Sequence, residues 1–191
     1  PGADFYLVKL EAIRIADSPL APLLTLIVEP GIEGEGVDRV RGEWEERENL
    51  RYEFFKELLE RARDKTKLHQ NVTPTKGNWI SCGAGKSGLH WKYRIRKNSA
   101  DVMLEIATDD GEYNRKLLSK LRKNRDDIEQ AFGKELMWDK QEGRRRCYVQ
   151  KTLERGGYRD DREQWPDIQD AMIEQMVQLQ DSLQPYVQKF S

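Results

Sequence analysis

Long apolar runs and cysteines are scarce in this sequence of 191 residues, and each scarcity excludes a class of protein. The longest apolar run, residues 23–28, is interrupted by Thr25 and is far shorter than the roughly 20 residues that span a bilayer. No signal peptide is visible. The two cysteines, Cys82 and Cys147, match no metal or redox spacing. We therefore predict a cytoplasmic protein with two buried thiols, no metal site and no cofactor.

Acidic residues are missing altogether from one window, Lys65–Ala100. It contains both histidines, His69 and His90, and the cations Lys65, Lys67, Lys76, Lys86, Lys92, Arg94, Arg96 and Lys97. The chain has a formal net charge of −1, so the residues outside the window sum to −9, from 25 cations and 34 acids. Charge segregated in this way favours a polyanionic partner on one surface.

The composition that remains is that of a folded protein. Five Trp, seven Tyr and five Phe argue against disorder, and 191 residues can bury a core for one domain or for one domain with an appendage. Because the sequence begins with Pro1 rather than Met, we expect an excised fragment.

The first 42 residues predict a hairpin and a linker. Residues 5–15 and 23–28 have the composition of strands, joined by a turn at Asp17-Ser18-Pro19. A two-stranded hairpin is marginal alone, so residues 1–30 must pack on the rest of the chain or on a segment upstream. Glycines and alternating charge predict a linker over residues 31–42. The α+β domain is then expected over residues 43–191.

Apolar periodicity predicts a helix over residues 43–67, with its buried stripe at Trp44, Phe55, Leu58, Leu59 and Ala62. Strands are predicted over residues 79–82, 89–97 and 101–108, with a two-residue turn at Asn98-Ser99. This turn pairs Ile95 with Val102, Tyr93 with Leu104 and Trp91 with Ile106 on one face, and Arg96 with Asp101 and Lys92 with Glu105 on the other.

For the residues after 108, the sequence pattern predicts a helix, a hairpin and a long final helix. The helix over residues 111–132 breaks near Lys123-Asn124-Arg125 and stops at Gly133. The hairpin turns at Glu142-Gly143 and places Leu136, Trp138 and Asp139 opposite Val149, Cys147 and Arg146. Trp165-Pro166 opens the last helix, which Pro185 should kink. The predicted fold class is α+β, an antiparallel sheet of about five strands packed with three or four helices, plus an N-terminal β-hairpin.

The segment Gly83-Ala84-Gly85-Lys86-Ser87 is similar to part of a phosphate-binding P-loop. However, Ile80 stands where that pattern needs glycine, and a strand follows where the P-loop has a helix. We interpret the segment as a glycine-rich hairpin loop. The alternative is a loop whose backbone N–H groups receive a nucleic-acid phosphate.

The basic face of the strand over residues 89–97 is the next candidate site. Its cations could track phosphates, but pairing with Asp101 and Glu105 would make it an ordinary solvated face. Trp91 and Tyr93, on the other face, are expected in the core. Arg144-Arg145-Arg146 could extend the cationic surface. The predicted nucleic-acid-binding residues are Lys76, Lys86, His90, Lys92, Arg94, Arg96, Arg144 and Arg145.

Catalytic patterns are weak throughout the sequence. Neither histidine has a Ser or Cys partner in a catalytic arrangement, and we expect surface or hydrogen-bonded histidines. Helix capping and dipole pairing explain the paired carboxylates, which are Asp109-Asp110, Asp126-Asp127 and Asp160-Asp161. The apolar stripe of the last helix, Ile168–Phe190, predicts packing on the sheet or, alternatively, a homodimer surface.

Several segments, in order, resemble an uncharacterised prokaryotic family that is named only as a domain of unknown function. They are Asn71-Val72-Thr73-Pro74, Asn78-Trp79-Ile80, Gly83 to Leu89, Asn114, Ile128-Glu129, Ala131-Phe132-Gly133, Glu135-Leu136, Trp138, Trp165-Pro166 and Pro185. The resemblance covers residues 44–190. That domain often forms the C-terminal part of restriction-endonuclease-like proteins, and Phe5-Tyr6-Leu7-Val8 resembles the end of the upstream nuclease domain.

The resemblance implies a location rather than a chemistry. The nuclease signature of an acidic residue, any residue and then Lys is absent from the sequence, so no catalytic residue can be carried over. We therefore expect a non-catalytic accessory module of a prokaryotic nuclease, in a phage-defence context, which binds nucleic acid such as DNA or positions the nuclease on it. The alternatives are a protein-interaction module that dimerises through Ile168–Phe190, and an enzyme with a hydrolytic site of its own.

Overall fold

An antiparallel five-stranded sheet forms the centre of the larger of two units in the computed structural model, which describes residues 7–13, 21–28, 35–139, 143–153 and 156–190. The units are Pro1–Glu46 and Arg47–Ser191, and each is considered by itself. Together with the helices below, the sheet confirms the predicted α+β class.

The first unit contains the predicted hairpin. Strands β1 (Leu7–Ile13) and β2 (Ala21–Val28) pair antiparallel, with Leu10 opposite Leu24. The predicted turn at residues 17–19 lies outside the described residues, as do residues 5, 6, 15 and 31–34. Helix α1 (Glu35–Arg63) starts in this unit, before the predicted start at Glu43, so residues 35–42 are helical rather than a linker. Glycine costs only about 1 kcal/mol in a helix interior, which a helix of 29 residues can tolerate.

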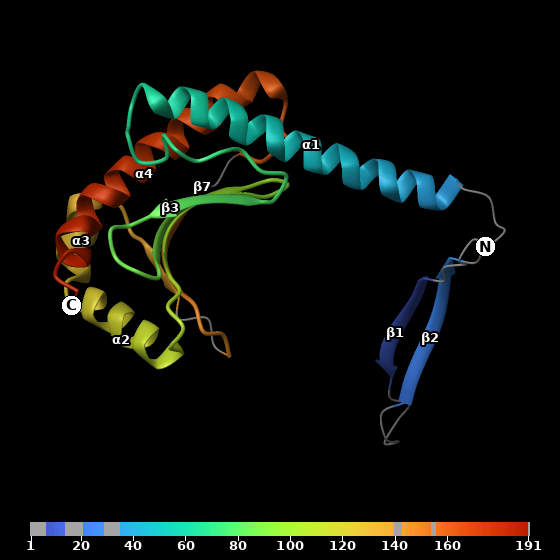
Figure 1. Ribbon diagram of the computed structural model, residues 1–191, viewed down its shortest axis with the longest axis horizontal. Helices are drawn as coiled ribbons and strands as arrows, with labels where there is room; N and C mark the ends of the chain where they lie inside the picture. Colours follow the sequence, from blue (N-terminus) through green and yellow to red (C-terminus); the bar gives the residue numbers. More distant parts are fainter. Residues whose placement is uncertain (1–6, 14–20, 29–34, 140–142, 154–155, 191) are drawn as a thin grey trace. The chain divides into compact units, whose positions relative to one another are not determined.

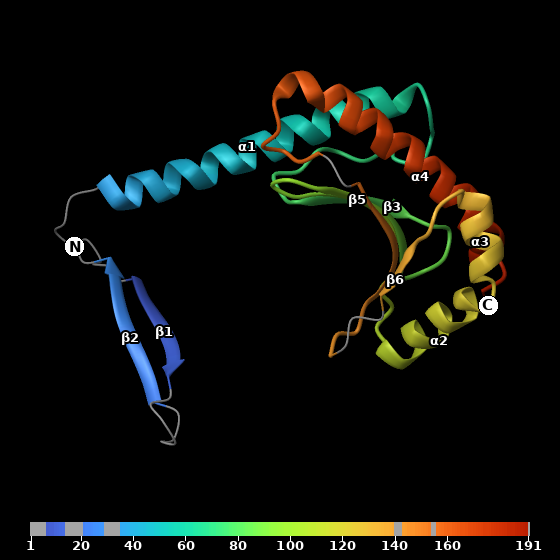
Figure 2. The same cartoon turned by 180° about the vertical axis from the view of Figure 1, so that it is seen from behind.

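The second unit has the strand order β3-β4-β5-β7-β6, all antiparallel. Its helices gather on one side of the curved sheet (Figures 1 and 2). The elements after α1 are β3 (Trp79–Gly83), β4 (Leu89–Ile95), β5 (Ala100–Ile106), α2 (Gly111–Arg122), α3 (Arg125–Phe132), β6 (Met137–Asp139), β7 (Cys147–Leu153), a short 3-10 turn (Arg162–Gln164) and α4 (Trp165–Val187). The predicted break between α2 and α3 is confirmed, and Asp110 caps α2 by accepting from the backbone N–H groups of Glu112 and Tyr113.

The predicted register of β4 on β5 is wrong by two residues. Ile95 pairs with Ala100 rather than Val102, and Arg94 rather than Arg96 lies opposite Asp101. The reason is the position of the turn. The N–H of Arg96 donates to the carbonyl of Ser99 (2.8 Å), which makes Lys97-Asn98 the central pair instead of Asn98-Ser99. A slip of two residues preserves the face on which each side chain lies, so the apolar pattern could not detect it.

The β6–β7 hairpin differs from the prediction in the same way. Trp138 pairs with Val149 rather than Cys147, and Asp139 lies opposite Tyr148 rather than Arg146. Gly143, in the predicted turn, has a φ of 75°, which favours glycine, while Glu142 is outside the described residues. Arg146 is consequently displaced from Asp139 and donates to Glu105 on β5.

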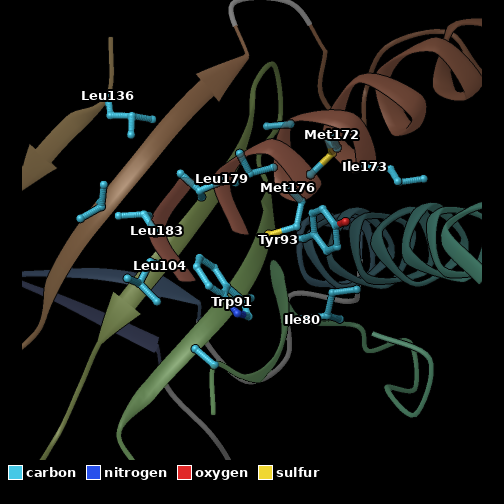
Figure 3. Close-up of a cluster of buried hydrophobic side chains, with 14 of the residues drawn as sticks. Ile80, Trp91, Tyr93, Leu104, Leu136, Met172, Ile173, Met176, Leu179 and Leu183 are labelled. Atoms are coloured by element: carbon cyan, nitrogen blue, oxygen red, sulfur yellow. The ribbon is translucent and has the colours of Figure 1, made fainter. Parts of the chain in front are cut away.

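The hydrophobic core lies between the helices and one face of the sheet, here named the core face (Figure 3). Trp91 and Tyr93 are buried in it, as predicted, whereas Trp44 of the predicted α1 stripe is 58% exposed. Of the two thiols predicted to be buried, Cys147 is buried and Cys82 is partly exposed.

The apolar stripe of α4 packs inside the same core, which confirms packing on the sheet. Its members Met172, Met176, Leu179 and Leu183 are all fully buried. The helix ends at Val187, two residues after Pro185. Among the helices of the described residues, none pairs the length needed to cross a bilayer with a sufficiently apolar sequence.

Candidate nucleic-acid interface on the polar face of the sheet

The face of the sheet opposite the core face carries polar side chains from all five strands, and we name it the polar face. Strand alternation sends every second residue to it, and the register aligns these residues in three rows across the sheet. The rows are Trp79, Arg94, Asp101 and Thr152; then Ser81, Lys92, Met103, Gln150 and Met137; then Gly83, His90, Glu105, Tyr148 and Asp139.

Glu105, on the central strand β5, is the hub of one half of this face. The Lys92 ammonium lies 2.6 Å from its Oε2, and Arg146 and the Tyr148 hydroxyl donate to its Oε1 at 3.2 Å each. Burial pushes the pKa of Glu105 up, but the hydrogen bond and charge of Lys92, with Arg146 and Tyr148, outweigh it, so that the net pKa is lowered. Glu105 is therefore ionised at neutral pH.

Lys92 is held from two sides. Its ammonium contacts Glu105 and also lies 4.4 Å from the centroid of the Trp79 ring, a cation–π contact. Burial lowers the pKa of Lys92, and the hydrogen bond and charge of Glu105 oppose this effect. A short contact between ammonium and carboxylate is the charge-assisted kind of hydrogen bond, which fixes both side chains.

Asp101 is the hub of the other half and is 0% exposed. Arg94 Nε donates to its Oδ2 (2.8 Å), the Thr152 hydroxyl donates to its Oδ1 (2.6 Å), and Arg96 Nε lies 3.6 Å away. Arg94 also donates to Gln150 Oε1 (3.2 Å), so its guanidinium bridges strands β5 and β7. A buried carboxylate with these partners is fully compensated.

The polar face is buried at its centre and open around it. Met103 is 0% exposed and Lys92 4%. The Trp79 ring lies against the Lys92 ammonium, and Arg94 and Gln150, on the strands to either side of Met103, are hydrogen-bonded to each other. The outer cations remain accessible, since the side chains of Arg96 and Arg146 are 50% and 51% exposed. Four cations thus share the two buried carboxylates, and with Asp139 on the edge strand counted as well, the face stays net positive.

The predicted binding residues do not form one bare cationic patch. His90, Lys92, Arg94 and Arg96 lie together on the polar face, as their alternation indicated, but each contacts a carboxylate. Lys76 pairs with Glu48 at 3.9 Å and Arg145 with Asp109 at 3.3 Å, away from these rows. Lys86 and Arg144 are exposed on the connecting loops. The window that lacks acids in sequence is therefore supplied with acids by the neighbouring strand in space.

Trp79 of this face was missed from the sequence, and Arg146, although part of the arginine run that could extend the cationic surface, was not among the predicted binding residues. Trp79 is 47% exposed, although tryptophan is highly buried on average. Its position in the alternation of β3, where the next residue Ile80 is buried, was the available signal. Arg146 reaches Glu105 only because β7 pairs with β5, a long-range pairing that no local pattern reveals.

The glycine loop between β3 and β4 is a hairpin connection, as predicted, and not the strand-to-helix turn of a P-loop. The backbone N–H of Ala84 in this loop already donates to the Leu89 carbonyl (2.9 Å), and the N–H of Leu89, at the start of β4, donates to the Lys86 carbonyl (3.1 Å). Gly88 has a φ of 75°, and a Cβ there would lie 2.6 Å from Thr108 Cγ2. Packing alone therefore requires glycine at this position.

His69 belongs to the core rather than to a catalytic site. It is 2% exposed, its Nε2 lies 3.3 Å from the Trp91 carbonyl, and its ring is 4.6 Å from the Tyr93 ring centroid. Burial lowers its pKa to about 4, so the imidazole is neutral at physiological pH. It is the hydrogen-bonded histidine that the sequence predicted.

The comparison with protein families gives one match. The model of a family described as "Domain of unknown function (DUF4268)" matches residues 50–187, which include every strand of the sheet. No curated protein matches the chain, and no solved structure matches it.

Proposed function

The chain belongs to the DUF4268 family, a domain of unknown function, and from this premise we propose that its polar face binds nucleic acid. In this proposal the domain has no catalytic residue of its own. It acts as an accessory module of a prokaryotic restriction-like nuclease, in phage defence, and holds the nucleic acid or positions the nuclease on it. This nuclease context rests on the resemblance of the sequence segments, and the binding role rests on the polar face.

One observation carries the proposal: the excess of cations over buried carboxylates on the polar face. Arg94 and Lys92 satisfy Asp101 and Glu105 at close range, whereas Arg96 and Arg146 contact the same carboxylates from farther out and are half exposed. A phosphate can therefore approach the two outer guanidinium groups without stripping the buried acids of their partners. Arginine suits this role because its planar fork matches two phosphate oxygens.

The surface predicted for dimerisation is not exposed. The α4 stripe on which it depended is covered by the core of the same chain, so a partner helix cannot use it without unfolding the domain. No described contact favours this alternative over nucleic-acid binding.

The proposal is tested by titrating labelled single-stranded and duplex DNA with the chain at salt concentrations between about 50 and 200 mM. The variant is Arg96→Gln/Arg146→Gln, which removes two charges without placing new acids beside Asp101 and Glu105. We expect weaker binding to both probes and a slope of log affinity against log salt that is smaller by about 2. The matched control is Lys116→Gln/Lys120→Gln, which removes two exposed lysines from α2 on the helical side.

Absence of binding by the wild-type chain at the lowest salt would end the proposal. So would an equal loss in the polar-face variant and in the α2 control, since that result would attribute binding to overall charge.

A further inference from the structure

A cavity of about 570 Å³ opens beside the free edge of β3, where the loop of residues 71–77 passes the strand. This size is within the range of pockets that enclose small organic groups. Its lining combines hydroxyl and amide groups with apolar surface, from Asn71, Val72, Thr73, Thr75, Trp79 and Ser81. No charged side chain is among the described residues that line it.

Trp79 belongs both to this cavity and to the polar face. Its ring carries the Lys92 ammonium at 4.4 Å, yet 47% of the residue remains exposed, so the indole has accessible surface for stacking. Its backbone carbonyl accepts a hydrogen bond from the Thr75 hydroxyl (3.3 Å), which ties the strand to the loop on the far side of the cavity. Arg94 lies opposite Trp79 in the register, so the two residues are neighbours in one row of the polar face.

We propose that this cavity receives one unstacked base of a single-stranded nucleic acid, with Trp79 as the stacking platform. The inference rests on the proposed function and adds the form of nucleic acid that is bound. Single-stranded binding sites combine a cationic track for the backbone with aromatic side chains on which bases stack. Here the accessible cation is the half-exposed Arg96, which follows Arg94 on the same side of β4, and Trp79 lies opposite Arg94.

The lining explains why a base suits the cavity better than a phosphate or an aliphatic group. A phosphate would enter without meeting a cation, since the cations lie on the polar face and not in the cavity. An aliphatic group would leave the side-chain polar groups of Asn71, Thr73 and Ser81 without partners. The edge of a base offers donors and acceptors to these groups, while its flat face covers the indole.

The test compares two fluorescein-labelled strands of about 12 nucleotides, one of oligothymidylate and one abasic strand of the same length and charge. The variants of the full chain are Trp79→Ala and Trp79→Phe. The control is Trp44→Ala, an exposed tryptophan that does not line the cavity. We expect Trp79→Ala to weaken oligothymidylate binding about tenfold, Trp79→Phe to retain most of it, and Trp44→Ala to leave it unchanged.

Binding of the abasic strand separates this inference from the proposed function. We expect the abasic strand to bind the wild-type chain through its phosphates and to bind Trp79→Ala equally well. If the wild type bound both strands with the same affinity, or if Trp79→Ala weakened both equally, the base pocket would be refuted while phosphate binding stood. If neither strand bound, the base pocket would be refuted, and the duplex titration would decide the proposed function.

Discussion

The core face and the polar face of the sheet are both buried at their centres, but different chemistry buries them. On the core face Trp91 and Tyr93 are covered by helices, and the contacts are apolar (Figure 3). On the polar face Asp101 and Lys92 are covered by long side chains from neighbouring strands, and the contacts are ion pairs and hydrogen bonds. Residues adjacent along one strand therefore enter two different environments.

This difference indicates which substitutions each face can tolerate. The stability of an apolar core depends on how completely side chains fill its volume, because its interactions are short-ranged and non-directional. The stability of a network of buried charges depends on each charge having a partner, because one unpaired buried charge costs more free energy than the loss of the whole pair. The core face should therefore be sensitive to truncation, and the polar face to removal of one partner.

Truncation of neighbouring residues on the two faces should give the largest effects. Leu104 and Met103 are both 0% exposed and point to opposite faces of β5. We expect Leu104→Ala to lower the free energy of unfolding by about 4 kcal/mol and Met103→Ala by about 3 kcal/mol, measured by urea denaturation. A cost below about 1 kcal/mol for Met103→Ala would show that water fills the centre of the polar face.

Removal of one buried charge should be nearly as costly. Lys92→Met removes the closest partner of Glu105, and we expect a loss of about 3 kcal/mol in the free energy of unfolding. The double variant Lys92→Met/Glu105→Leu removes both charges and should lie within about 1 kcal/mol of the wild type. If the double variant were less stable than Lys92→Met, charge balance would not be what holds this face together.

Acid should weaken the core face through His69. The folded pKa of about 4 is below the value of about 6.5 in the unfolded chain, so the unfolded state takes up the proton first as the pH falls. This histidine should therefore lower stability by about 1.4 kcal/mol per pH unit between pH 6.5 and pH 4, or about 2 kcal/mol by pH 5, with no effect above that window.

His69→Gln retains a donor for the Trp91 carbonyl and cannot titrate, so the stability difference between wild type and variant should narrow from pH 7 to pH 5. Urea denaturation at several pH values measures it. His90→Gln, on the half-exposed side of the sheet, is the matched control. A constant difference between wild type and His69→Gln would contradict a neutral, buried imidazole.

The smallest effect is expected at an exposed pair. Lys76 and Glu48 are 3.9 Å apart with both side chains well exposed, so Lys76→Ala should change the free energy of unfolding by less than about 0.5 kcal/mol. Thermal melts of the wild type and of Lys76→Ala at low and high salt would show this effect as a small change in the midpoint temperature. A loss as large as that of Lys92→Met would mean that the exposed and the buried ion pairs contribute equally to stability.

Local patterns in the sequence were enough to predict the strands and, for β4 and β5, the face on which the side chains lie. The alternation of Trp91 and Tyr93 with Lys92 and Arg94 assigned both faces of β4 correctly. The register was not predictable, because moving the β4–β5 turn by one residue shifts every pair by two and changes no face. The helical start at Glu35 was missed because glycine and alternating charge suggested a linker.

The candidate site was predicted less completely than the fold, for a physical reason. Charge segregation along the chain indicated where cations gather, but Asp101 and Glu105 come from the next strand and neutralise much of that charge. The contribution of Arg146 depends on β7 pairing with β5, and the cavity depends on where the loop of residues 71–77 packs. These are long-range arrangements, which residue spacing does not encode.

The most direct test of the polar face as a binding surface is an NMR titration of the ¹⁵N-labelled chain with oligothymidylate, following the arginine Nε–H and tryptophan indole N–H signals. We expect shifts for Arg96, Arg146 and Trp79, and none for the buried Trp91 and Trp165. Shifts confined to residues on the helical side, or no shifts at about 50 mM salt, would contradict it.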